Sequence, residues 1–350
     1  METIFISIAS YRDRLCSQTL ENLFKNAKFP QRIYVGICEQ NKDSDVDCLS
    51  NNFKWRDNIR LIKKDYKEAK GPTWARFLCS TLYRNEDFFL QIDAHTLFVK
   101  DWDEKCIQMV HSLENSPEVE NKKVLLSHYP PQISDYKENP SDENVTHMVE
   151  CFFNDEGLIS FKGAQWKKPG PLPRRNAFIA GGFIFCRGSW IKDVPFDPYL
   201  DYLFVGEEIL LSARSYTSGW DVYTPNKNII YHAYTRDNEP KFWSDNSYNS
   251  SEAKEKAKII LQLEHDLSKL TNKKVFNSIK KYNCGNVRSL QDFYDFIGID
   301  IKTKTIGKPK IEFFTLEGMD SPTPERKHFL FLCLLLLCVV CIYFFRCYAC

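Results

Sequence analysis

The sequence has almost no excess of charge of either sign, because 47 Lys and Arg residues nearly balance 46 Asp and Glu residues. This balance leaves no overall basic field to gather phosphate backbones, so nucleic acid is not expected as a partner. The chain also lacks a Walker loop, a zinc-protease HExxH and a GxSxG elbow. The usual signals of an ATPase, a metalloprotease and an esterase are therefore missing.

A secretion signal is also missing from the N-terminus. The opening METIFISIASYRDR has no basic leader and no small-residue cleavage pattern, so it is interpreted as a strand. Near the other end, residues 329–345 (FLFLCLLLLCVVCIYFF) contain no charge and reach the lower limit of about 17–25 residues for a spanning helix. PERKH and Arg346 supply polar flanks. We expect a single-pass C-terminal tail anchor, with the domain before it facing the cytosol.

Of the 13 cysteines, the eight that precede the apolar run at residues 329–345 show no paired, metal-type spacing. Several lie in or just beyond the apolar run at residues 329–345, and the others are scattered along the chain. A disulfide framework or a structural zinc site would call for regular spacing. The distribution instead suits a reducing compartment.

Apolar runs alternate with helical patterns from Thr3 to about Asp93, which is typical of a doubly wound parallel sheet. The expected strands are IFISIAS, RIYVGICEQ, NIRLIKKD and FFLQID, and the expected helices are RLCSQTLENLFKNA, GPTWARFLCSTLYRN and DWDEKCIQMVHSLEN. The sequence thus favours an α/β fold.

The second half of the chain is less regular. We expect strands in VLLSHYPP, FIAGGFIFC and VYTPNKNIIYHAY, a hairpin in VECFFNDEGLISF, and helices in GEEILLSARSYTSG and SEAKEKAKIILQLEHDLSKL. The predicted organisation is a main domain over residues 1–270, a small helical appendage over 271–300, a tether over 301–328 and the membrane segment over 329–345.

Two polar residues interrupt the apolar stretch FFLQIDAHTLF. Asp93 and His95 are two residues apart at the end of a predicted strand, so their side chains point to the same face. In an open α/β sheet this strand end lies in the ligand crevice. A carboxylate with an imidazole favours Mn²⁺, with Mg²⁺ as the alternative. A satisfied polar pair without a metal is the other interpretation.

Several motifs in the same order resemble those of metal-dependent glycosyltransferases of the GT-A fold. They are GPTWARFLCSTLYRNEDFFLQIDAHTLF, GGFIFC and VGEEILLSARSYTSGWDVYTP, and the opening IASYRD and NLFKNAKFPQRIYVGICEQN agree with them. The chain resembles in particular the cytoplasmic protein-hydroxyproline N-acetylglucosaminyltransferases that modify a ubiquitin-ligase adaptor. More distantly it resembles the polypeptide N-acetylgalactosaminyltransferases. The likeness covers roughly Thr3 to Tyr234 and implies a Rossmann-like GT-A fold with a mixed sheet.

The resemblance implies roles for particular residues. Asp93 and His95 would bind the metal and the diphosphate, with His232 as a third metal ligand; a packed core histidine is the alternative for His232. The matching positions that would contact the nucleotide or the sugar are Ser10, Tyr11, Arg12, Asp13, Arg76, Gly181 and Gly182. A surface salt bridge is the alternative for Arg76, and a β-bulge is the alternative for the two glycines.

Glu207 and Glu208 are the candidate catalytic carboxylates. Because they are adjacent in a predicted helix, their side chains diverge by about 100° and are unsuited to sharing one proton. The resemblance favours Glu207 for contact with a sugar. The alternative is that both stabilise the positive end of the helix dipole.

The expected function is metal-dependent transfer of N-acetylglucosamine from UDP-GlcNAc to a hydroxyl of a protein or glycan, and the resemblance implies retention of anomeric configuration. The membrane segment departs from the soluble family, so the acceptor stays open. One alternative is a metal-dependent phosphoesterase, which normally needs more ligands than a chain with seven scattered histidines offers. Another is a non-catalytic, membrane-tethered module that binds carbohydrate or protein.

Overall fold

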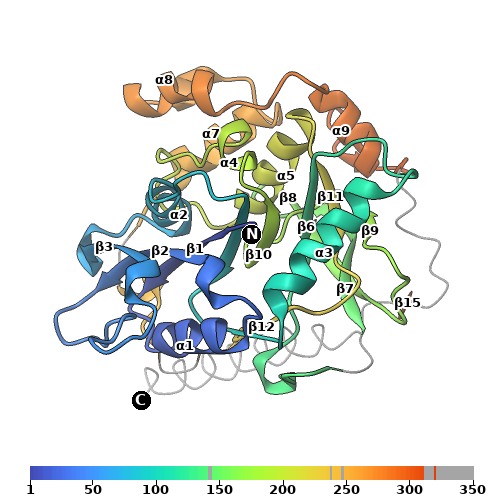
Figure 1. Ribbon diagram of the computed structural model, residues 1–350. Helices are drawn as coiled ribbons and strands as arrows, with labels where there is room; N and C mark the ends of the chain where they lie inside the picture. The colour runs from blue at the N-terminus through green and yellow to red at the C-terminus, as the bar shows by residue number, and fades with distance from the viewer. Residues whose placement is uncertain (141–143, 237–238, 246–247, 311–318, 321–350) are drawn as a thin grey trace, which may run out of the picture.

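The central sheet of the computed structural model mixes parallel and antiparallel strands (Figure 1). The model describes residues 1–140, 144–236, 239–245, 248–310 and 319–320. In spatial order the strands are β3 (Ile59–Asp65), β2 (Ile33–Asn41), β1 (Ile4–Tyr11), β4 (Phe88–Asp93), β10 (Phe183–Arg187), β6 (Val124–Ser127), β11 (Asp221–Thr224) and β9 (Arg174–Asn176). β10 runs antiparallel to both β4 and β6, while β1 to β4 are mutually parallel where they pair.

The side chains of β1 alternate between the two faces of the sheet, as period-2 patterning requires. Ile4, Ile6 and Ile8 belong to a core that includes α1 and α3, whereas Phe5 packs with Phe89 in a core that includes α4 and α5. The helices are α1 (Cys16–Asn26), α2 (Pro72–Ser80), α3 (Trp102–Asn115), α4 (Trp190–Asp193), α5 (Glu207–Thr217), α6 (Phe242–Asp245), α7 (Ser251–Ile260), α8 (Lys273–Tyr282) and α9 (Leu290–Ile297). Helices on both faces give a three-layer α/β arrangement.

Smaller sheets lie around the central one. β5 (Thr96–Phe98) pairs with β12 (Ile230–His232), and β13 (Ile299–Asp300) pairs with β14 (Thr305–Ile306). The hairpin of β7 (Val145–Phe153) and β8 (Ile159–Trp166) gains a third strand, β15 (Met319–Asp320). A second core joins the hairpin to α5, α7 and α9. The hairpin therefore packs against the helical end of the chain.

Most of the expected elements are confirmed within a few residues, including the alternation up to β4 and the hairpin. The helix expected over residues 251–270 is wrong in length, because α7 ends at Ile260 and Gln262 has a positive φ of 53°. Part of the expected tether, β15, pairs with β8. The domain boundaries themselves stay a prediction.

No helix in the described part of the chain combines the length and apolar character needed to cross a membrane. The expected membrane segment at residues 329–345 lies outside that part. Its anchoring role and the cytosolic orientation remain predictions.

A disulfide joins Cys16, at the start of α1, to Cys48, in the segment after β2. Both residues are buried. The expectation of scattered, unpaired cysteines is wrong for this pair. A separation of 32 residues without a motif carries no sign of pairing, which depends on how β1, α1 and β2 fold together.

His128 lies fully buried directly after β6, with its ring edge-on to Phe183 at a centroid distance of 5.2 Å. Neither ring nitrogen has a hydrogen-bond partner among the described residues. Burial lowers the pKa of His128 from 6.5 to about 3. Protonation therefore opposes folding, so the stabilisation is complete above pH 6.5 and is lost as the pH falls towards 3.

We expect His128 to remove about 2 kcal/mol from the free energy of unfolding between pH 7 and pH 5. Urea unfolding at the two pH values should show a smaller pH dependence for His128→Leu than for the unsubstituted protein. His265→Leu is the control, because His265 is exposed. An equal pH dependence in the His128 variant and the control would contradict this account.

Candidate active site

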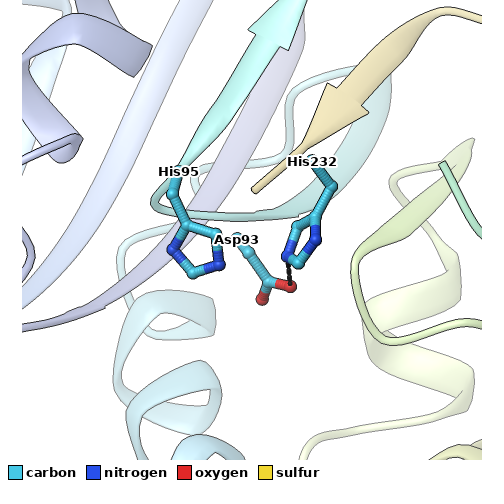
Figure 2. Close-up of side chains that lie close together, drawn as sticks. All are labelled: Asp93, His95 and His232. Carbon is cyan, nitrogen blue, oxygen red and sulfur yellow. Dashed lines mark hydrogen bonds and ion pairs between the residues drawn. The ribbon is translucent and has the colours of Figure 1, made fainter. Parts of the chain in front are cut away.

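Asp93, His95 and His232 come together at the end of β4 (Figure 2). Asp93 ends β4, His95 precedes β5, and the pairing of β12 with β5 sets His232 opposite Thr96. One potential ligand atom from each of the three residues lies within 4.8 Å of the others. Among the described residues, no other group of three His, Cys, Asp or Glu side chains has its potential ligand atoms this close together. The structure thus brings the predicted ligand set together.

Contacts within this cluster keep the Asp93 carboxylate ionised. His232 Nε2 lies 3.0 Å from Asp93 Oδ2, and the rings of His95 and His232 have centroids 4.6 Å apart. Burial alone would raise the pKa of Asp93. The hydrogen bond with His232 and the charges of Arg76 and both histidines outweigh burial, so the pKa lies well below its usual range. An ionised carboxylate is the form that binds a cation.

The Asp13 carboxylate contacts the imidazole ring of His95. Its Oδ2 is 2.6 Å from His95 Nδ1 and accepts a second hydrogen bond from Arg236 Nη1 at 2.7 Å. Burial would raise the pKa of Asp13, but the contacts with His95 and Arg236 lower it. A carboxylate on Nδ1 leaves Nε2 as the ring nitrogen for a metal and fixes the orientation of the ring. The predicted role of Asp13 in nucleotide binding stays a prediction.

Arg76, on α2, connects two of the predicted site residues. It donates from Nη2 to Asp93 Oδ1 at 3.0 Å and from Nη1 to Glu207 Oε2 at 2.5 Å. Arg76 is only 6% exposed, which excludes the surface salt bridge considered for it. Burial would lower its pKa, but the two carboxylates outweigh burial and raise it. The guanidinium therefore stays charged inside the site.

Gly181 and Gly182 lie against these charged groups. A Cβ at Gly181 would lie 3.1 Å from Arg76 Nη1, and a Cβ at Gly182 would lie 3.1 Å from Asp93 Oδ2. Gln91 Nε2 also donates to the Gly181 carbonyl at 2.6 Å. Glycine at these two positions thus leaves room for the Arg76 and Asp93 side chains.

Glu207 and Glu208 diverge at the start of α5, as their adjacent positions predict. Glu207 pairs with Arg76, whereas Glu208 accepts from the Gly181 backbone N–H and the Tyr129 hydroxyl, each at 2.7 Å. Burial raises the pKa of Glu208, although both hydrogen bonds act in the opposite direction. The Oε1 atom of Glu207 is buried and has no hydrogen-bond partner among the described residues.

Ser10, Tyr11 and Arg12 follow one another at the end of β1. The Tyr11 hydroxyl donates to Asp245 at 3.0 Å, and Arg12 pairs with both Asp45 and Asp245 at 2.8 Å. The hydroxyl of Ser10 is buried and has no partner in the described part of the chain. Arg12 has φ 46°, a left-handed conformation that directs the chain out of the strand. The nucleotide contacts expected here stay predictions.

Sequence reasoning missed three residues that hold the site. Tyr129 and Arg236 lie in irregular segments, where nothing in the local pattern marks them. Gln91 could have been identified from the sequence, because it is a polar residue inside the apolar run FFLQID. A buried glutamine in a strand requires a partner, and the Gly181 carbonyl is that partner.

One family model and several solved structures are similar to this chain. A family model described as Glycosyltransferase (GlcNAc) matches residues 3–55 and 51–303. A search of curated protein sequences finds no match. The crystal structure of GalNAc-T7 with UDP, GalNAc and Mn²⁺ is 12% identical with a TM-score of 0.57, covering 87% of this chain and 58% of that one. The S. aureus TarS 1–349 structure in complex with UDP-GlcNAc is 16% identical with a TM-score of 0.47, covering 80% of this chain and 73% of that one.

The GalNAc-T7 likeness confirms the expected α/β fold of GT-A type with a mixed sheet. This chain spans little more than half the length of that structure's chain.

Removal of the Asp13 carboxylate, which contacts His95, is expected to weaken metal binding. Asp13→Ala should lower the affinity for Mn²⁺ about 10–100-fold, because His95 loses the partner that orients its ring. Asp13→Asn keeps an oxygen acceptor and should lose less. Calorimetric titration with Mn²⁺ measures both effects.

The control is Asp221→Ala, which removes a buried carboxylate paired with Arg175 and Arg288 outside the cluster. Equal Mn²⁺ affinities for Asp13→Ala and the unsubstituted protein would show that Asp13 does not support the ligand set.

Proposed function

Because this chain belongs to the glycosyltransferase (GlcNAc) family, we propose that it transfers N-acetylglucosamine from UDP-GlcNAc to an acceptor hydroxyl with the help of a divalent cation. The observation that carries the proposal is the convergence of Asp93, His95 and His232 at the end of β4. A solved structure of similar fold contains UDP, a sugar and Mn²⁺, which supports a UDP-sugar donor. Family membership also argues against the phosphoesterase and non-catalytic alternatives.

The donor atoms at this position fit Mn²⁺. One carboxylate and two imidazoles offer the mixed oxygen and nitrogen ligands that Mn²⁺ accepts, with Mg²⁺ as the harder alternative. Gly182 keeps the approach to the Asp93 carboxylate open, because a Cβ there would crowd Oδ2. When bound, the cation would stabilise negative charge on the departing diphosphate.

Arg76 adds a second positive charge beside the proposed diphosphate site. Its guanidinium is held on both sides by Asp93 and Glu207, so it is pre-organised rather than free to reorient. Burial strengthens its electrostatic effect, because little water screens it. Arg76 therefore supports departure of the nucleotide while it fixes the positions of two carboxylates.

Of the two candidate carboxylates, Glu207 is the one we assign to sugar contact. Its buried Oε1 lacks a partner among the described residues and can accept a hydrogen bond from a sugar hydroxyl. Both oxygens of Glu208 accept hydrogen bonds from the protein itself. Glu208 is accordingly a positioning residue for the Gly181 backbone.

Purified protein should release UDP from UDP-GlcNAc when Mn²⁺ is present and should not do so after chelation. His95→Ala should lower this release roughly 100-fold or more, because a ligand is lost. The melting temperature should change little, since the ring is not in the apolar core.

His111→Ala is the matched control, because His111 lies on α3 and contacts Glu2 outside the cluster. A panel of other UDP-sugars identifies the donor. The proposal would be overturned if no UDP-sugar gave Mn²⁺-dependent release, or if His95→Ala retained full activity.

Arg76→Lys should lower kcat on the order of 100-fold, because one ammonium group cannot reproduce the fork that bridges Asp93 and Glu207. Steady-state UDP release measures kcat and KM separately. Arg32→Lys is the control, since Arg32 is a buried arginine that bridges Asp103 and Glu104 away from the site. A similar kcat for the Arg76 and Arg32 variants would argue against a role for Arg76 in nucleotide departure.

A further inference from the structure

A hollow of about 820 Å³ lies beside the site. Its walls come from the segment around residues 129–140, from Thr146 and Gln165 on the β7–β8 hairpin, and from Tyr231 and Tyr234 around the end of β12. Such a volume is within the range of about 300–1,000 Å³ that small-molecule sites occupy. None of the predicted site residues lines it.

Three contacts join this hollow to the site. The ring of Tyr234 lies 4.3 Å from the ring of His232, measured between centroids. The Tyr129 hydroxyl donates to Glu208 at 2.7 Å. The backbone N–H of His232 donates to the Pro131 carbonyl at 2.9 Å. The hollow therefore adjoins the site, with Tyr234 against the metal-ligand candidate His232 and Tyr129 against Glu208.

The lining has the chemistry of a site for a neutral polyhydroxyl ligand. Asp135 and Lys137 are its only charged residues among the described lining positions. Hydrogen-bonding capacity comes mainly from side-chain amides and hydroxyls, such as those of Gln132, Thr146 and Gln165. An amide offers a donor and an acceptor side by side, which matches neighbouring sugar hydroxyls. Tyrosine rings add flat apolar surface with a polar edge.

We infer that this hollow binds the acceptor and that the acceptor is a neutral oligosaccharide. The inference rests on the proposed function and specifies its acceptor. The oxygen of one acceptor hydroxyl bonds to the anomeric carbon of the donor sugar as the bond from that carbon to the diphosphate oxygen breaks. The diphosphate keeps the electron pair and receives the hydroxyl proton.

A charged or strongly apolar acceptor fits the hollow less well. A phosphorylated or acidic acceptor would need several cations, and Lys137 is the single one in the described lining. An apolar acceptor would make little use of the amides and hydroxyls that line the hollow. These contrasts favour sugar hydroxyls over either class.

To test this inference, the hollow is filled with a larger side chain, and glycoside binding is measured separately from sugar transfer. Gln165 is an exposed residue on β8 and lies outside the metal cluster, so Gln165→Trp should occupy the hollow without disturbing the core. Probes are the 4-nitrophenyl glycosides of glucose, galactose, mannose, N-acetylglucosamine and cellobiose. The full chain is held in a detergent without a sugar headgroup, because such a headgroup would compete.

Saturation-transfer NMR should detect binding of at least one glycoside to the unsubstituted protein. Gln165→Trp should lower that binding at least about tenfold. With UDP-GlcNAc and Mn²⁺, the same glycoside should accept the sugar, detected as a larger product by mass spectrometry. For each protein, the rate of sugar transfer to the glycoside is divided by the rate of UDP release without glycoside. This ratio should fall by the same factor in the variant.

Gln108→Trp is the matched control, because Gln108 is an exposed glutamine on α3 that does not line the hollow. Two results would overturn the inference: no glycoside binds, or glycoside binding is unaffected by Gln165→Trp. Glycoside binding in a protein that never releases UDP would instead count against the proposed function alone.

Discussion

The buried guanidinium of Arg76 is the group around which the site is organised. It lies between Asp93 and Glu207, so it ties α2 to the end of β4 and to the start of α5. Burial of two carboxylates near one another would be costly without a cation between them. Arg76 lowers that cost, and glycine at position 181 leaves room for it, because a Cβ there would lie 3.1 Å from Arg76 Nη1.

The antiparallel strand β10 explains how distant segments reach this cation. Because β10 pairs antiparallel to β4, its first residue, Phe183, lies opposite Ile92, next to the end of β4. The preceding glycines are therefore delivered directly to Asp93 and Arg76. A parallel strand at this position would have brought its far end there instead. The antiparallel direction of β10 thus places Gly181 and Gly182 at the site.

Sequence patterns predicted the features that depend on residues close together in the chain. The alternation of strands and helices up to β4, the shared face of Asp93 and His95, and the divergence of Glu207 and Glu208 all follow from period and spacing. Family resemblance, and not spacing, pointed to His232. The pairing of β5 with β12 that delivers His232 joins residues far apart in the chain, and no local pattern encodes it.

Local sequence patterns also fail to identify residues whose role is to position other site residues. Asp13 was expected at the nucleotide, but its contact with His95 depends on the path of the chain after β1, where Arg12 takes a left-handed conformation. Tyr129 lies in SHYPP, a segment with no motif, and only the tertiary structure brings its hydroxyl to Glu208. Sequence therefore predicted the side chains that gather at the end of β4 better than it predicted the groups that orient them.

Glu208 occupies a position that links the two halves of the proposed reaction. One of its oxygens accepts from Gly181, beside Arg76, and the other accepts from Tyr129, which lines the hollow. Both hydrogen bonds are partly buried, so the loss of either one would cost free energy. A shift of Tyr129 by a bound acceptor would therefore act on the Gly181 backbone, and through it on the surroundings of the leaving nucleotide. In the proposed reaction, acceptor binding and donor positioning would share this one carboxylate.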